Sequence, residues 1–181
     1  MSRPPRARES VLDAYAALLI ADGERAATVE ATARTAGVSK GGLLYHFASK
    51  DALNEALIEH MRALALSDTE AIRTAPEGPI AAFMRISTMT GSPADRAIVA
   101  VSRLAQSGNP AAVEALRGLR TAWEDAIRPH ARDETALQMV LLVSDGLYFN
   151  AALTIGSVLG PVPEGEELAA LIAFVENAAQ R

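Results

Sequence analysis

The sequence predicts an all-α protein, because its apolar residues recur at intervals of three and four and strand-like alternation is nearly absent. Alanine is abundant, whereas aromatic residues make up only 4% of the 181 residues. Glycine, proline and capping residues divide the helical pattern into nine segments. We expect a small N-terminal domain, residues 1–50, followed by a larger helical domain, residues 51–181.

The first three predicted helices carry their own start and stop signals. The first ends at Gly23, since glycine accepts the left-handed conformation that often follows a helix. Its apolar face comprises Val11, Tyr15, Leu18 and Leu19. Thr28 is a suitable N-cap for a second helix at 29–36, and Ser39 for a third at 40–47.

Six further helices follow, separated by proline and glycine. A long helix is expected from about residue 49 to about residue 73, with a buried stripe at Leu53, Leu57, Met61 and Leu64. The remaining helices are expected at 80–90, 94–107, 110–131, 134–158 and 165–180.

The charge of the chain is unevenly divided. The net charge is −5, yet residues 1–50 carry seven basic and five acidic residues, whereas residues 51–181 carry ten and seventeen. Both lysines of the chain, Lys40 and Lys50, belong to the first segment. A nucleic acid responds to local rather than total charge, so the acidic total does not exclude DNA binding.

The sequence gives no sign of export or membrane insertion. No apolar run follows the N-terminal arginines, as a signal peptide would require. No segment approaches the roughly 20 apolar residues of a membrane span. Without cysteine, neither disulfides nor a thiolate metal site can form. We therefore expect a cytoplasmic protein that does not bind a membrane.

The segment AGVSKGGLLYHFASK, residues 36–50, is arranged as the end of a helix-turn-helix motif. Gly41 and Gly42 fall in the first turn of the third helix, where glycine costs less than in a helix interior. Their missing side chains would let this helix approach DNA closely. Lys40 would reach base edges or phosphate. The alternative is a short connector helix with a flexible start.

Residues 28–53, TVEATARTAGVSKGGLLYHFASKDAL, resemble the DNA-binding domain of the tetracycline repressor (TetR) family. The shared pattern is a Thr that opens the second helix, an Ala-Gly-Val-Ser turn, an aromatic cluster and a Ser-Lys pair. The resemblance implies DNA-backbone contacts from Thr28, Tyr45, His46 and Lys50, and contacts at or near base edges from Ser39, Lys40 and Gly42, with Gly41 beside them.

Four other positions complete this comparison. The resemblance implies that Val38 and Phe47 are core residues of the motif. Thr32 and Leu44 depart from it, because the family usually has an aliphatic residue at the first position and often Tyr at the second. Thr32 predicts that the core under the second helix is slightly depleted of apolar side chains. Leu44 predicts that Tyr45 takes over the phosphate contact of the family's Tyr or only packs.

The resemblance implies a three-helix helix-turn-helix domain followed by a larger ligand-binding and dimerisation domain. The segments 134–158 and 165–180 would then pair with their copies at a homodimer interface. The first of them is apolar on nearly every side, which a monomer core alone does not require. The alternative is an ordinary core helix.

A ligand is expected to be small and apolar or amphipathic. The large or adaptable side chains available to line its cavity are Met84, Met89, Trp123, Tyr148 and Phe149. Asp145, Asn150 and His130 are polar groups that could orient it. The alternative at each of these positions is plain core or, for His130, a solvated helix end.

We found no catalytic set, since the three histidines have no second histidine or carboxylate at metal-ligand spacing. No metal, cofactor or enzymatic activity is therefore expected. The sequence indicates a ligand-responsive transcriptional regulator, a repressor released from a palindromic operator by a small molecule. The alternatives are a helical ligand-binding module without DNA regulation and a small helical enzyme.

Overall fold

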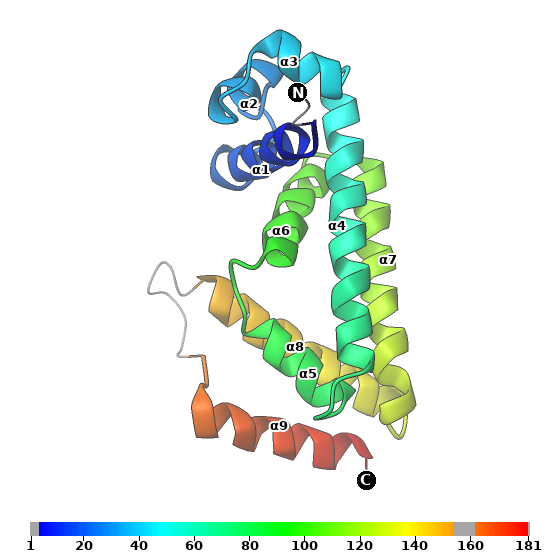
Figure 1. Ribbon diagram of the computed structural model, residues 1–181. Helices are drawn as coiled ribbons and strands as arrows, with labels where there is room; N and C mark the ends of the chain where they lie inside the picture. The colour runs from blue at the N-terminus through cyan, green and yellow to red at the C-terminus, as the bar shows by residue number, and fades with distance from the viewer. Residues whose placement is uncertain (1–3, 154–161, 181) are drawn as a thin grey trace. The chain divides into compact units, whose positions relative to one another are not determined.

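The computed structural model describes residues 4–153 and 162–180, which form helices and no strand (Figure 1). The α-helices are α1 (Pro4–Asp22), α2 (Val29–Thr35), α3 (Lys40–His46), α4 (Lys50–Arg73), α5 (Pro79–Ser87), α6 (Pro93–Gln106), α7 (Pro110–Ile127), α8 (Glu134–Leu153) and α9 (Gly165–Gln180). A 3-10 turn, η1 (Arg128–His130), follows α7. The predicted all-α class is confirmed. The predicted continuation of the eighth helix to residue 158 lies outside the described residues.

The chain packs into two compact units. Of the described residues, 4–65 and 93–118 form the first unit, and 66–92, 119–153 and 162–180 form the second. Each unit therefore combines separate stretches of sequence. The functional boundary expected after residue 50 stays a prediction.

In the first unit, α1 packs against α2, α3 and α6. Val11, Tyr15 and Leu19 of its predicted apolar face are completely buried. Leu43 of α3 and Leu57 of α4 are buried in the same unit. Removing a side chain of this size from water contributes about 1.5–3 kcal/mol, so these few contacts fix the short helices.

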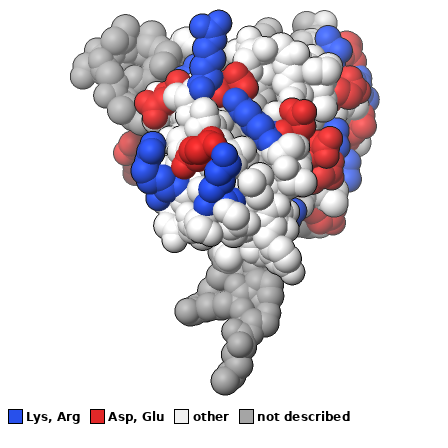
Figure 2. All heavy atoms as spheres, turned by 90° about the horizontal axis from the view of Figure 1, so that it is seen from above, with Lys and Arg blue, Asp and Glu red and all other residues white. Residues whose placement is uncertain are grey.

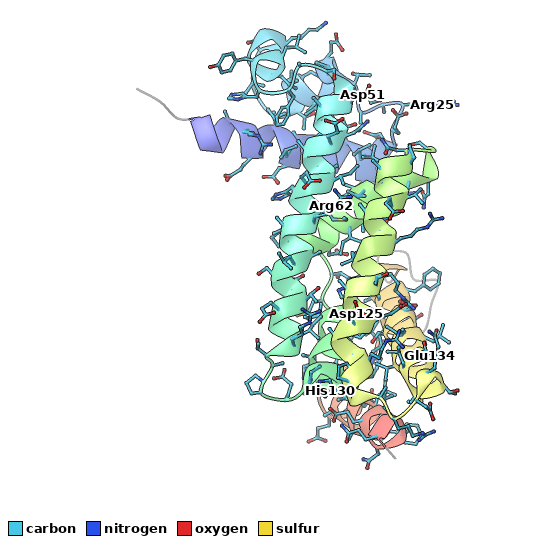
Figure 3. All side chains as sticks on the ribbon, turned by 90° about the vertical axis from the view of Figure 1, so that its right-hand side faces the viewer. Arg25, Asp51, Arg62, Asp125, His130 and Glu134 are labelled. Atoms are coloured by element: carbon cyan, nitrogen blue, oxygen red, sulfur yellow. The ribbon has the colours of Figure 1, made fainter. Side chains whose placement is uncertain are left out.

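A buried hydrogen bond joins α1 to α4. The Tyr15 hydroxyl donates to Asn54 Oδ1 at 2.6 Å, and both residues are buried. Burial raises the pKa of the Tyr15 hydroxyl, and the nearby carboxylates of Glu24 and Asp51 raise it further. The hydroxyl therefore stays protonated and remains a donor. Figure 3 shows Asp51 at the N-terminal end of α4.

The second unit contains a core formed by α5, α8 and α9, which pack against one another. The buried positions of α8 are Ala136, Leu137, Val140, Leu141, Ser144 and Leu147. Those of α9 are Leu168, Ile172, Val175 and Ala179. Leu142, Phe149 and Phe174 remain 64%, 58% and 70% exposed. Within the described part of α8, Leu142 and Phe149 are exposed apolar residues beside the exposed polar residues Gln138 and Asp145.

The seventh helix ends at Ile127, four residues earlier than predicted. Pro129 explains the difference, because proline has no N–H to donate and disfavours the helical conformation in the residue before it. The chain tightens into η1 at this point.

The connection from η1 to α8 is held by polar contacts, and Figure 3 labels His130 and Glu134 in this region. Asp133 Oδ1 accepts a hydrogen bond from the Ala136 N–H at 2.8 Å and so caps α8. This bond holds the pKa of Asp133 below its usual value, with a further contribution from Arg132. Arg128 and Glu134 form an ion pair, and His130 is exposed.

We predict that Tyr15→Phe lowers the free energy of unfolding by about 1–3 kcal/mol, because Asn54 Oδ1 would stay buried without its donor. Tyr45→Phe is the matched control, since Tyr45 is 86% exposed. Thermal unfolding followed by circular dichroism measures both variants. Equal midpoints for the two variants would contradict the stabilising role of the Tyr15–Asn54 bond.

Candidate nucleic-acid interface

Both helices of the predicted helix-turn-helix begin at their predicted caps. Thr28 Oγ1 accepts a hydrogen bond from the Ala31 N–H at 3.1 Å, and Ser39 Oγ accepts one from the Gly42 N–H at 3.0 Å. Gly37 turns the chain between them with φ +68°, a conformation that glycine adopts without strain. Local sequence signals therefore set both ends of the motif.

The recognition helix α3 has two different sides. Leu43 and Phe47 are buried, whereas Lys40, Gly41 and Tyr45 are exposed. Leu44 is exposed beside Tyr45. Lys40 and Leu44 are one turn apart, as are Gly41 and Tyr45, so the four positions form one continuous exposed side. The helix thus presents a lysine, a glycine, an apolar residue and an aromatic residue to solvent.

The remaining predicted DNA contacts lie around this face. Ser39 and Thr28 are exposed, and Gly42 and His46 are partly buried. The Tyr45 and His46 rings pack edge to face with centroids 5.3 Å apart. These positions are compatible with the predicted contacts, which stay predictions.

The side chain of Thr32 is fully buried, yet its hydroxyl has a hydrogen-bond partner. Its hydroxyl donates to the Thr28 carbonyl at 2.8 Å, so a buried polar group is satisfied within α2. Phe47 is buried, and the Arg8 guanidinium lies 5.2 Å from the centroid of its ring. Val38 is partly buried.

The paired glycines differ in their surroundings. A Cβ on Gly41 would meet nothing within 4 Å, whereas a Cβ on Gly42 would lie 3.1 Å from Ser39 Oγ. The Gly42 N–H is also bonded to that oxygen. A side chain at position 42 would therefore crowd the Ser39 cap of α3. At position 41 no neighbouring atom of the protein would obstruct a side chain, so packing within the protein does not require glycine there.

Each lysine of the chain pairs with a glutamate. Lys40 forms an ion pair with Glu30 of α2, and Lys50 pairs with Glu24 at 2.5 Å. The Lys50 ammonium also donates to the Glu24 carbonyl at 2.7 Å. Lys50 therefore ties the start of α4 to the loop between α1 and α2, in addition to any contact with DNA.

The two glutamates are functional candidates that the sequence did not single out. No fixed spacing connects Glu24 to Lys50 or Glu30 to Lys40, because each pair joins different elements. Figure 2 shows basic and acidic side chains interleaved on the face seen from above. Acidic groups must therefore be included in any account of how this surface meets a phosphate backbone.

The five predicted ligand-binding residues all belong to the second unit, but they differ widely in how exposed their side chains are. Met84 is fully buried in the core of this unit, and Trp123 packs against the same core with its ring centroid 5.7 Å from that of Phe83. Tyr148 is partly buried. Met89 and Phe149 are 61% and 58% exposed. A cavity of about 40 Å³ in the first unit, between α1, α4 and α6, is lined by none of the five.

Three polar groups were expected to orient a ligand. Asp145 accepts two hydrogen bonds from Arg120 Nη1, at 2.8 and 2.9 Å, and is therefore already neutralised. His130 is exposed, and Asn150 is partly buried. The assignment of these groups to a ligand stays a prediction.

Ser144 is a polar candidate that the sequence analysis missed. Its side chain is 1% exposed and its Oγ has no hydrogen-bond partner. Other helical hydroxyls bond to their own backbone, as Ser87 does to the Phe83 carbonyl at 2.9 Å. The sequence could have indicated this buried hydroxyl, because Ser144 follows the buried Val140 by four residues and so lies on the same apolar stripe of α8.

Two further properties concern the described residues. Their histidines and carboxylates include no group of three or more that could hold a metal ion. None of their helices combines the length and apolar composition that crossing a bilayer requires.

Two family profiles match the sequence. The one for bacterial regulatory proteins of the tetR family matches residues 11–57, and the one for the tetracyclin repressor-like C-terminal domain matches residues 77–175. The second match covers more than half of the chain. The chain therefore belongs to the tetR family of bacterial regulatory proteins. Its predicted class, a ligand-responsive DNA-binding transcriptional regulator, is confirmed by this membership.

Solved structures show the same fold. A member of the TetR family from Streptomyces coelicolor is 21% identical with a TM-score of 0.63, over 95% of this chain and 98% of that one. A gamma-butyrolactone receptor is 20% identical with a TM-score of 0.64, over 97% and 100%. The multidrug binding protein EbrR, complexed with ethidium, is 18% identical with a TM-score of 0.58, over 96% and 99%. No curated protein matches the sequence.

We predict that Gly41→Ala raises stability but weakens DNA binding. The added methyl group meets open space, and alanine at a compatible site stabilises by about 0.4–1 kcal/mol. Gly42→Ala is the comparison, because crowding of Ser39 Oγ should offset the same gain. Thermal unfolding and gel shift with DNA from beside the coding region measure the two effects. Undiminished DNA binding by Gly41→Ala would contradict close approach at this position.

Proposed function

We propose that the protein is a cytoplasmic repressor that binds a palindromic operator as a homodimer and is released by a small molecule. The observation that carries the proposal is the exposed side of α3, where Gly41 and Tyr45 stand opposite the buried Leu43 and Lys40 is exposed in the first turn. A helix presented in this way can enter the major groove while its other side stays packed.

Within this proposal, residues at the start of α3 read bases and the residues around them bind the backbone. Ser39, Lys40 and Gly42 lie at or near base edges, and Gly41 permits close approach. Lysine suits this position because its ammonium can donate to the acceptor atoms of guanine or to phosphate. Thr28, Tyr45, His46 and Lys50 contact phosphates, which orient the protein without reading sequence.

The homodimer forms through the exposed apolar residues of α8 and α9. Leu142, Phe149 and Phe174 are more than half exposed although each is large and apolar. A second copy that covers them would remove this apolar area from water. Two recognition helices are also needed, because one helix contacts too few base pairs to select a genomic site.

The ligand binds in the second unit, among apolar side chains that include the buried Met84 and the partly buried Trp123, with the unpaired Ser144 hydroxyl as its polar contact. Similar structures include a gamma-butyrolactone receptor and a multidrug binding protein complexed with ethidium. The side chains available here favour an apolar or amphipathic molecule with one group that can form a hydrogen bond.

We predict that Lys50→Ala weakens binding to operator and unrelated DNA by a similar factor, because a phosphate contact carries no sequence information. Gel shifts compare a duplex from beside the coding region with an unrelated duplex of equal length. Glu24→Gln is the control, since it breaks the same ion pair but keeps the ammonium. If both variants lost affinity equally, Lys50 would act only by holding α4 in place.

We predict that Phe174→Glu produces a folded monomer with reduced operator binding, because a carboxylate would be buried at the dimer interface. Ile172 is unsuitable for this test, since it lies in the core of its own chain. Leu66→Glu is the control, because Leu66 is 71% exposed but belongs to α4. Sedimentation gives the mass of each variant. Dimers of Phe174→Glu would exclude α9 from the interface.

A further inference from the structure

The helix-turn-helix carries few charges, so each one matters to its electrostatic potential. Residues 28–47 contain two cations, Arg34 and Lys40, and one carboxylate, Glu30, which gives a net charge of +1 with His46 neutral. Glu30 neutralises the lysine at the start of the recognition helix. Glu30→Gln would therefore double the net charge of this segment.

The Glu30–Lys40 pair is exposed to solvent and can open. The side chains of Lys40 and Glu30 are 56% and 60% exposed. Exposed pairs of this kind contribute little to stability, so a competing anion can replace the glutamate. The hydrogen bond from Lys40 holds the pKa of Glu30 below its usual value, which keeps the carboxylate charged.

The second pair behaves differently. Lys50 and Glu24 are 30% and 31% exposed, and Lys50 also donates to the Glu24 carbonyl at 2.7 Å. This pair joins two elements of the fold and is less accessible to a competing phosphate. The Glu30–Lys40 pair is therefore the more easily opened of the two, whereas Lys50 can keep its pair when it contacts a phosphate.

We propose that Glu30 is a specificity-determining residue, which withholds Lys40 from the phosphates of unrelated DNA and so widens the difference between operator and unrelated sequences. The inference rests on the proposed function. On unrelated DNA, Lys40 gains only a phosphate contact, for which it must leave Glu30. At the operator, Lys40 keeps its pair with Glu30 while its remaining N–H donors reach base acceptors, so only binding to unrelated DNA loses the ion pair.

The test compares Glu30→Gln with the unchanged protein on two duplexes, one from beside the coding region and one of unrelated sequence. We expect roughly two- to fivefold tighter binding to the unrelated duplex, the range that an exposed ion pair supplies. A smaller gain is expected on the first duplex. The logarithmic salt dependence on unrelated DNA should steepen by about 0.9, as one more phosphate is neutralised.

The control for net charge is Glu55→Gln, which removes one exposed carboxylate from α4. It raises the charge of the protein by the same amount but leaves the Glu30–Lys40 pair intact. Equal effects of Glu30→Gln and Glu55→Gln would overturn the inference, because only total charge would then matter. Circular dichroism verifies that both variants are folded.

A double substitution tests whether Glu30 acts through Lys40. In a Lys40→Ala background, Glu30→Gln should change affinity no more than Glu55→Gln does, because no lysine remains to be released. A gain that persists without Lys40 would mean that Glu30 simply repels phosphate. If the unchanged protein bound neither duplex, the proposed function would fail and this inference with it. Binding without a specific effect of Glu30→Gln would overturn the inference alone.

Discussion

The recognition surface depends on the burial of one side of a very short helix. Seven residues do not form a persistent helix in water, since nucleation is unfavourable and few bonds follow it. Leu43 of α3 and Phe47 directly after it are buried, the helix packs against α1 and α2, and Ser39 caps its first turn. The same contacts that hold α3 also fix which residues point outward. Stability and recognition in this motif therefore have the same origin.

Contacts that are local in sequence could be predicted, whereas those between elements could not. Thr28 and Ser39 cap helices through hydrogen bonds to residues three positions away, and Gly37 turns the chain between them. These local signals predicted the bounds of α2 and α3 to within one residue. The Tyr15–Asn54 bond spans 39 positions, and its partners have no fixed spacing. The Glu30–Lys40 pair depends on the packing of two helices. Apolar periodicity alone extends α7 to residue 131, whereas Pro129 ends the helix at Ile127.

Apolar periodicity has a similar limit in the second unit. It indicated that α8 and α9 are rich in apolar residues, but it could not separate a monomer core from a surface for a second copy. Burial makes this distinction, since Ile172 is 4% exposed and Phe174 is 70% exposed. It also separates Met84 from Met89 among the ligand candidates. Ser144 was overlooked because one hydroxyl scarcely alters the apolar pattern of a helix.

The central claim is that two copies of α3 read the two halves of one operator. Selection of bound sequences from a duplex library with a randomised centre tests this claim without knowledge of the natural operator. We expect an enriched inverted repeat, whose half-sites lie about one helical turn apart, roughly 34–36 Å, or a multiple of that distance. Enrichment of single, unpaired half-sites, or of no sequence at all, would contradict it.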